Sequence, residues 1–139
     1  MEILSNISLI LNPTTFGLIL GSTIVGVLIG ALPGLSSGMA IALLLPFTIY
    51  LEPSQAIAAM AALYCGGTFG GSITAILINA PGAPPAAATA FDGFPMAQKG
   101  QAGKALGMAA VSSVVGGIIS LAVLIIFAPT LARIAYKFG

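Results

Sequence analysis

Two Pro-Gly dipeptides, Pro33-Gly34 and Pro81-Gly82, mark the parts of this chain best suited to chemistry. Proline removes a backbone donor and glycine permits unusual dihedral angles, so a helix must open at each dipeptide. A helix that restarts after such a break presents free N–H groups, which suit a carboxylate. Hydroxyl and amide side chains flank both breaks: Ser36, Ser37, Ser72, Thr74, Asn79 and Thr89. The pattern predicts binding of an anionic group by backbone N–H groups and hydroxyls.

The first break offers two interpretations. Ser36 or Ser37 can cap the helix that follows it. Discontinuous transporter helices use such helix ends to hold anionic groups near the membrane midplane. An ordinary helix-turn-helix at the membrane surface would give the same local pattern, so both interpretations stay open.

The second break is preceded by three polar side chains. Ser72 and Thr74 can bond back to their own helix, as hydroxyls in lipid often do. Asn79 is a stronger candidate, because a buried amide needs several partners. Two residues before the break, it is expected to hold the opened backbone or to contact a ligand. Thr89 is a weaker candidate of the same kind.

The acidic residues beyond the N-terminus are Glu52 and Asp92. An acid within a membrane is a functional candidate, as an ion ligand or a proton carrier. Here Glu52 precedes Pro53 at a helix junction, and Asp92-Gly93 has the pattern of a turn or an N-cap. These positions favour interfacial roles over ion coupling. Histidine is absent and Cys65 is the single cysteine, so neither a metal site nor an enzyme is predicted.

Composition places these candidates in a membrane. The chain is 58% hydrophobic and 5% charged, whereas soluble domains carry roughly a quarter charged residues. A net charge of +1 without a basic cluster excludes a nucleic-acid partner. The length of 139 residues suits about four crossings. The partner of most of the surface is therefore membrane lipid.

The expected elements follow the breaks. Residues 14–32 form a span in which small residues repeat every four positions, first Gly17 and Gly21 and then Ser22, Gly26 and Gly30, which favours close helix packing. Residues 39–51 cover only about 20 Å, too short to cross, and predict half of a discontinuous or re-entrant helix. The fold class is therefore all-α: a polytopic membrane protein with discontinuous or re-entrant helices at the Pro-Gly breaks.

Further along, residues 53–80 are long enough to span. Gly66-Gly67 and Gly70-Gly71 within them indicate either close packing or a local break. The prolines and charges of residues 81–104 predict an internal connecting loop. Residues 105–128 form the last span, with Pro129 expected to disrupt it. Residues 1–139 are treated as a single transmembrane domain, whose first apolar helix is retained because no basic signal-peptide region precedes it.

The sequence resembles the large membrane subunit of tripartite tricarboxylate transporters, the TctA family, along most of its length. The similar segments are Gly30-Ala-Leu-Pro-Gly-Leu35, Ala42-Leu-Leu-Leu-Pro-Phe-Thr48, Gly70-Gly-Ser-Ile-Thr-Ala-Ile-Leu77, Asn79-Ala-Pro-Gly-Ala-Pro84, Asp92-Gly-Phe-Pro-Met96 and Lys99-Gly-Gln-Ala-Gly103. Ser36 departs from the family pattern, in which glycine is expected after Pro-Gly-Leu. The family's large subunit is several times longer, so the resemblance covers only its N-terminal portion.

The resemblance implies a secondary transporter that imports tricarboxylates or related carboxylates across the bacterial inner membrane. Expected partners are a periplasmic solute-binding protein, a small membrane subunit and the remaining half of the large subunit. A gradient of Na⁺ or H⁺ would drive uptake, and no other cofactor is expected. The alternative is a truncated, non-transporting membrane protein or an assembly partner.

The expected binding site has two parts. Pro33, Gly34, Ser36 and Ser37 would form one lip of the carboxylate or ion site. The other lip would contain Ser72, Thr74, Asn79, Pro81 and Gly82, with Thr89 nearby. Asp92 and Glu52 are possible but less favoured positions for ion coupling. The missing half of the transporter would complete both lips.

Overall fold

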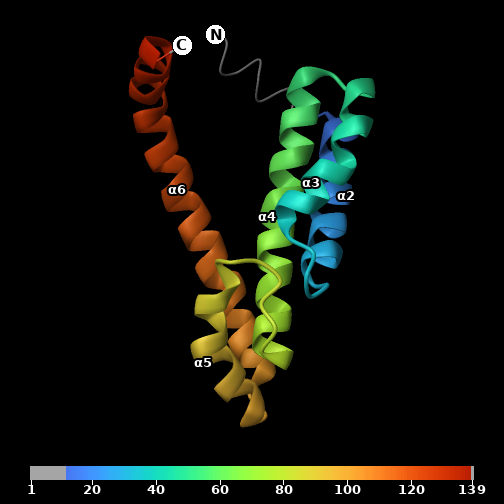
Figure 1. The fold of residues 1–139 in the computed structure, drawn as a ribbon, viewed down its shortest axis with the longest axis vertical. Helices are drawn as coiled ribbons and strands as arrows, with labels where there is room; N and C mark the ends of the chain where they lie inside the picture. The colour runs from blue at the N-terminus through green and yellow to red at the C-terminus, as the bar shows by residue number, and fades with distance from the viewer. Residues whose placement is uncertain (1–11, 139) are drawn as a thin grey trace.

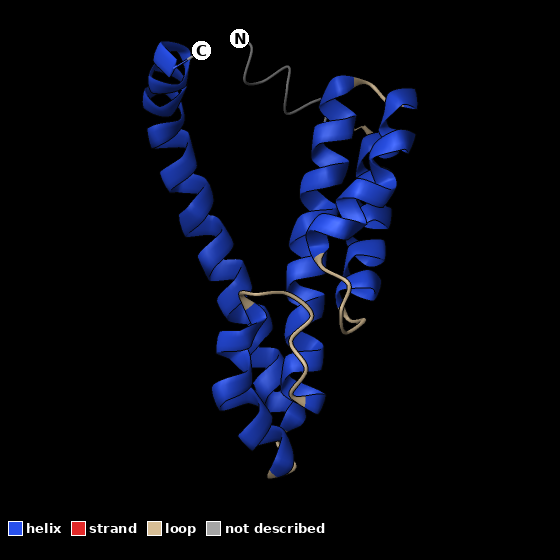
Figure 2. Cartoon of the chain, viewed as in Figure 1, coloured by secondary structure: helices blue, strands red, loops and turns tan. Residues whose placement is uncertain are grey.

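The computed structural model describes residues 12–138, and within this range the chain is helical with no strand (Figure 2). The side chains at positions 129, 130 and 132–138 lie outside the description. The elements are α2 (Pro13–Gly30), α3 (Ser37–Leu44), the 3₁₀ helix η1 (Leu45–Tyr50), α4 (Pro53–Ile78), α5 (Ala86–Gln98) and α6 (Ala102–Phe138). The predicted all-α fold class is confirmed.

Helices α2, α3 and α4 form one packed group (Figure 1). Pro13 begins α2 at a position where its missing N–H costs nothing. Helix α2 ends partway along α4, and α3 with η1 then returns toward the start of α4. The Ser36 side chain caps α3 by accepting the Met39 N–H at 3.2 Å. The short apolar segment predicted after the first break is thus confirmed, because it forms a returning helix too short to span.

The chain reverses twice more after α4. Asn79 ends α4 in the left-handed conformation, with φ of 54°. The Ala80 N–H then reaches back to the Thr74 carbonyl at 3.3 Å. From there the connection runs back along α4, and the Gly82 N–H donates to the Gly71 carbonyl at 3.4 Å. We call this connection, residues 79–85, the re-entrant segment. Helix α5 descends from the re-entrant segment, and α6 rises from the lower end of α5 (Figure 1).

Glycine packing holds the first group together. Helix α4 continues without interruption through Gly66-Gly67 and Gly70-Gly71, all of them buried. A Cβ on Gly66 would overlap the Thr23 carbonyl of α2, and one on Gly70 would overlap the Val27 carbonyl. Of the two interpretations of these glycines, close packing is confirmed and a local break is wrong.

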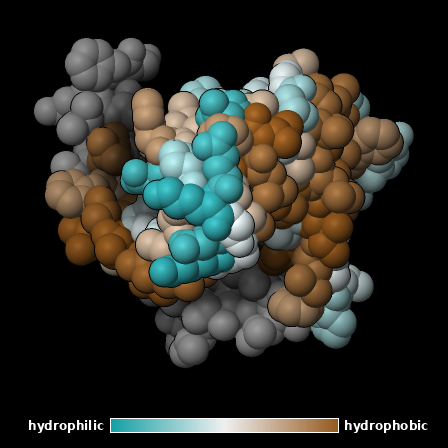
Figure 3. Space-filling model, turned by 90° about the horizontal axis from the view of Figure 1, so that it is seen from below, coloured by the Kyte–Doolittle hydropathy of each residue, from teal (hydrophilic) through white to brown (hydrophobic). Residues whose placement is uncertain are grey.

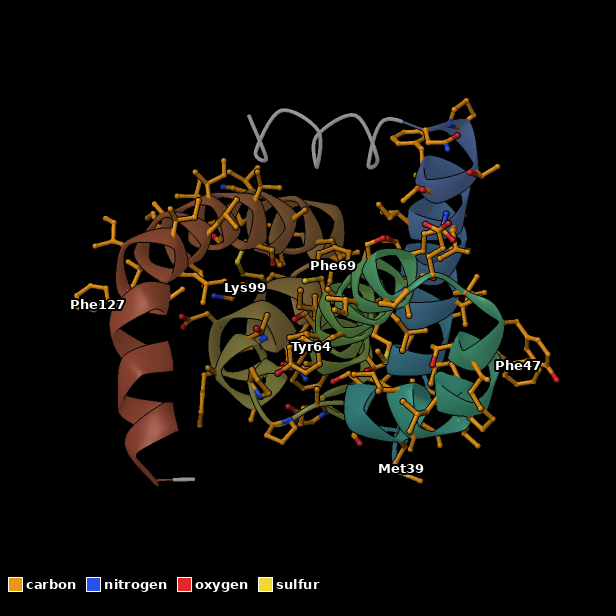
Figure 4. The ribbon with its side chains drawn as sticks, turned by 90° about the horizontal axis from the view of Figure 1, so that it is seen from above. Met39, Phe47, Tyr64, Phe69, Lys99 and Phe127 are labelled. Carbon is orange, nitrogen blue, oxygen red and sulfur yellow. The ribbon has the colours of Figure 1, made fainter. Side chains whose placement is uncertain are left out.

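Among residues 12–138, three helices are long and apolar enough to cross a membrane: Pro13–Gly30, Pro53–Ile78 and Ala102–Ala128. The length of the chain predicted about four crossings, and the fourth apolar segment is the short α3–η1 helix. Large apolar side chains cover the outside, and Phe47 and Phe127 point away from the bundle on opposite sides (Figure 4). The chain is a multi-pass membrane protein.

Helix α5 corrects two predictions. It occupies most of the segment 81–104, which was expected to be a loop. Pro84 and Pro85 lie before its first turn, where a missing N–H is tolerated. Asp92-Gly93 falls in the middle of α5, so it is neither a turn nor an N-cap.

Helix α6 corrects a third prediction. It continues past position 129 to Phe138, whereas Pro129 was expected to disrupt the span. Proline is tolerated within membrane helices because local adjustments and neighbouring groups satisfy the freed carbonyl. The proline rule for soluble helices therefore placed this boundary too early.

Candidate functional site

The chain segments that follow the two Pro-Gly breaks pack against adjacent turns of α4. An added Cβ on Gly67 would lie 2.8 Å from the Ser37 Cβ, and one on Gly71 would lie 3.2 Å from the Ala83 Cβ. Gly67 and Gly71 are one helical turn apart. The segment after the first break and the segment after the second therefore contact the same stripe of α4.

Gly30 connects the two contacts. A Cβ on Gly30 would overlap the Gly67 carbonyl, and a Cβ on Gly82 would overlap the Gly30 carbonyl. We call the set Gly30, Gly67, Gly71 and Gly82 the glycine junction. It forms only because four residues without side chains let three backbone segments touch. The glycine junction includes Gly82 of the second break but neither Pro33 nor Gly34 of the first.

The predicted hydroxyls take different positions around the glycine junction. Ser37 is buried, at 6% exposure, directly beside Gly67. Ser36 accepts the capping bond from α3. Thr74 is also buried, but its hydroxyl donates to the Gly71 carbonyl at 3.2 Å, the back-bonding alternative. Pro33 and Gly34 are exposed. The structure therefore places Ser37 and Gly82 against adjacent turns of α4 and leaves Pro33 and Gly34 at the surface.

A second polar region lies between α4, α5 and α6. It is a cavity of about 370 Å³ that opens to the surface, and we call it the polar hollow. Its lining is Ser72, Ala88, Thr89, Asp92, Gly93, Met96, Ala105, Met108, Ala109, Ser112 and Ser113. Three predicted site residues, Ser72, Thr89 and Asp92, thus meet here and not at the glycine junction. The Ser72 hydroxyl lies 3.5 Å from the Thr68 carbonyl, a long bond that leaves its oxygen free to accept.

Helical spacing explains the lining of the polar hollow. Thr89, Asp92 and Met96 lie three and four residues apart and share one face of α5. Gly93 brings that helix against α4, because an added Cβ there would lie 2.6 Å from Cγ1 of Ile76. Seen from below, hydrophilic residues gather at the α5–α6 end of the bundle between hydrophobic flanks (Figure 3). The polar hollow is open to the surface, and Asp92, Ser112 and Ser113 of its lining are exposed.

The remaining predicted residues lie elsewhere. Asn79 and Pro81 line a separate hollow with the aromatic rings of Phe91 and Phe94. Glu52 is exposed at the opposite end of α4, at its N-cap position. These residues do not join the polar hollow, and the interfacial role of Glu52 stays a prediction.

Sequence reasoning did not identify Ser112 or Ser113 as site residues. Both line the polar hollow, together with Ala105, Met108 and Ala109 of the same helix. These positions follow the i, i+3, i+4, i+7, i+8 spacing of one helix face. That spacing could have identified the two hydroxyls as neighbours of the α5 face, once α5 had been recognised as a helix.

Comparison with known proteins agrees with this architecture. The model of the tripartite tricarboxylate transporter TctA family matches residues 16–139. The chain belongs to this family. An uncharacterised 52.8 kDa protein of Agrobacterium vitis, named for the 3′ region of TAR-I ttuC′, is 42% identical over 143 residues. That alignment covers 100% of this TctA-family chain and 28% of the relative. No solved structure matches the chain.

Proposed function

We propose that this TctA-family chain is the membrane component of a secondary transporter that imports tricarboxylates or related carboxylates across the bacterial inner membrane. An ion gradient drives uptake, and a periplasmic solute-binding protein delivers the substrate. The chain works with a small membrane subunit and with the remaining part of a longer large subunit. Family membership and the three apolar spans support this proposal.

The observation that carries the mechanism is the meeting, at the glycine junction, of the chain segments beside the two Pro-Gly breaks. Gly82 contacts the Gly30 carbonyl, while Ser37 begins α3 one turn away along α4. Discontinuous membrane helices bind anionic groups at such interior ends. In the proposed site, the Ser37 hydroxyl and the first N–H groups of α3 bind one carboxylate of the substrate. Movement of the partner half against α4 exposes this site alternately to either side.

Carboxylate uptake into lipid vesicles tests the function. The chain is reconstituted alone and with its candidate partner subunits, and radiolabelled citrate is added together with the binding protein. We expect uptake only in the complete assembly and only with an imposed ion gradient. Absence of uptake in every combination, with insertion of the chain verified, would refute the proposal.

A matched pair of variants tests the site. Ser37→Ala keeps the Cβ beside Gly67 but removes the hydroxyl, and Ser54→Ala makes the same change at an exposed position of α4. A hydrogen bond to a charged group contributes about 1.5 kcal/mol, so we expect Ser37→Ala to weaken substrate affinity about tenfold. Ser54→Ala should match the unmodified chain. Equal affinity in all three proteins would remove Ser37 from the site.

A second candidate function is a non-transporting assembly subunit. The observation in its favour is α6, whose residues 111–128 are all exposed. A helix of this kind serves an assembly role as well as a transport role. The two functions separate in the same vesicles: an assembly subunit binds its membrane partners but is dispensable for uptake once they are present.

A further inference from the structure

The polar hollow contains the chemistry of a cation site, apart from the glycine junction. Oxygen-bearing side chains reach it from three helices: Ser72 from α4, Thr89 and Asp92 from α5, and Ser112 and Ser113 from α6. Its other lining residues are Ala88, Gly93, Met96, Ala105, Met108 and Ala109. Hard cations prefer carboxylate and neutral oxygen ligands. We propose that the polar hollow binds Na⁺, with the Asp92 carboxylate and the surrounding hydroxyls as ligands.

The charge of its lining residues indicates which class of ligand the polar hollow binds. Asp92 is the only charged residue that lines the polar hollow, and its negative charge repels a carboxylate substrate. Lys104 is not among the lining residues; it lines an adjoining hollow that shares Met108 and Ser112 with the polar hollow. One carboxylate balances one monovalent cation, whereas a divalent cation would leave an uncompensated charge in an apolar environment. The polar hollow therefore fits Na⁺ better than Ca²⁺ or the transported anion.

The hydroxyls favour a metal cation over a proton. A proton needs only the carboxylate, whereas a dehydrated Na⁺ needs several oxygen atoms to replace its water. Four hydroxyl side chains share the cavity with Asp92, and hydroxyl oxygens accept in this way. A proton carrier at Asp92 would gain little from hydroxyls that three separate helices supply.

The order of residues along the helices gives the ligand a path. Helix α5 descends toward the polar end of the bundle and α6 rises from it (Figure 1). Along the two helices, Met96 and Ala105 lie at the end of the polar hollow nearest the connection between α5 and α6, and Thr89 and Ser112 lie at the other end, where Ser112 is exposed. Ser112 lies about 15 Å from the start of α6, at 1.5 Å per residue. Asp92, which is exposed, stands between the two ends, where it can attract a cation from water.

This inference deepens the proposed function by giving the coupling ion a site, but it is tested without transport. The full chain is placed in lipid nanodiscs, and NaCl is titrated by calorimetry against a choline chloride background. We expect saturable Na⁺ binding that Asp92→Asn weakens at least about tenfold, because it removes the only charged ligand. Glu52→Gln makes the same chemical change outside the polar hollow and should leave Na⁺ affinity unchanged.

Neutral variants make the test independent of the charge. Thr89→Val and Ser113→Ala each remove one hydroxyl with little change of shape, and each should weaken Na⁺ affinity several-fold. If Asp92→Asn does not fold, these two variants decide the outcome. The proposal is overturned if the chain shows no saturable Na⁺ binding or binds Ca²⁺ in preference to Na⁺. It is also overturned if Asp92→Asn, Thr89→Val and Ser113→Ala leave Na⁺ affinity unchanged, or if Glu52→Gln lowers that affinity equally.

The outcome also separates the two proposals. A chain that binds Na⁺ through Asp92 but supports no carboxylate uptake in any assembly contradicts the proposed function alone. An assembly that takes up carboxylate while this chain binds no Na⁺ contradicts the cation site alone.

Discussion

The two halves of this chain are assembled by different means. In the first half, α2, α3 and the re-entrant segment press backbone to backbone on α4, through the glycine junction and its neighbours. In the second half, α5 contacts α4 through Gly93 and a side chain, while residues 111–128 of α6 are all exposed. Rigid packing thus supports the proposed carboxylate site, and looser packing leaves room for the polar hollow. Substitutions that add one methyl group can measure this difference.

The largest effect is expected at the glycine junction. Gly30→Ala places a Cβ on the Gly67 carbonyl, which is backbone and cannot rotate away. Overpacking of this kind costs about 3 kcal/mol, so we expect a loss of that size in the free energy of unfolding. Circular dichroism during titration with SDS measures it. Gly17→Ala is the control, because open space surrounds Gly17 on the same helix; similar losses in both variants would disprove the rigid junction.

A smaller effect is expected from the same substitution in the second half. Gly93→Ala meets Cγ1 of Ile76, and a side chain can move where a backbone carbonyl cannot. We expect a loss of about 1 to 2 kcal/mol in the same SDS titration. Gly107→Ala, in open space on α6, should have no such cost. A loss for Gly93→Ala as large as that for Gly30→Ala would show that the two halves are equally rigid.

Asn79 separates a conformational role from a ligand role. Its φ of 54° is unfavourable for alanine, so Asn79→Ala should lose about 1 kcal/mol of stability. Asn79→Gly tolerates this backbone but lacks the amide. If the amide contacts substrate, both variants should show reduced carboxylate uptake in the complete vesicle assembly. Normal uptake by Asn79→Gly would leave Asn79 with the structural role alone, as the residue that ends α4.

Local rules account for much of the fold but not for its second half. The glycine spacing of α2 and α4 predicts close packing because residues four apart share a helix face. The predicted opening at Pro33 and Pro81 follows from the donor that proline lacks. The same rules predict a loop over 81–104, because proline and charge weigh against a helix there. These local rules do not describe tertiary contacts, such as the packing of Gly93 of α5 against Ile76 of α4.

The candidate sites, like the fold, are predicted only in part by local sequence rules. Spacing places Ser37 and Gly82 beside breaks, and the resemblance to a transporter joins these breaks into one site. Tertiary packing sets how far the re-entrant segment returns along α4. That distance determines which glycine contacts which backbone segment. Asp92 is assigned to a turn from its Asp-Gly pair alone. Only the presence of α5 places its carboxylate among the hydroxyls of the polar hollow.

The smallest predicted effect concerns the far end of the rigid half. The Gln55 side chain donates from Nε2 to the Thr15 hydroxyl at 3.3 Å and links α4 to α2. Hydrogen bonds between membrane helices contribute about 0.6 kcal/mol on average. Gln55→Ala, Thr15→Val and the double variant form a cycle in the SDS titration, with a coupling energy of that size expected. A coupling near zero would show that glycine packing alone aligns the two helices, so that the rigidity of the first half comes from its backbone contacts.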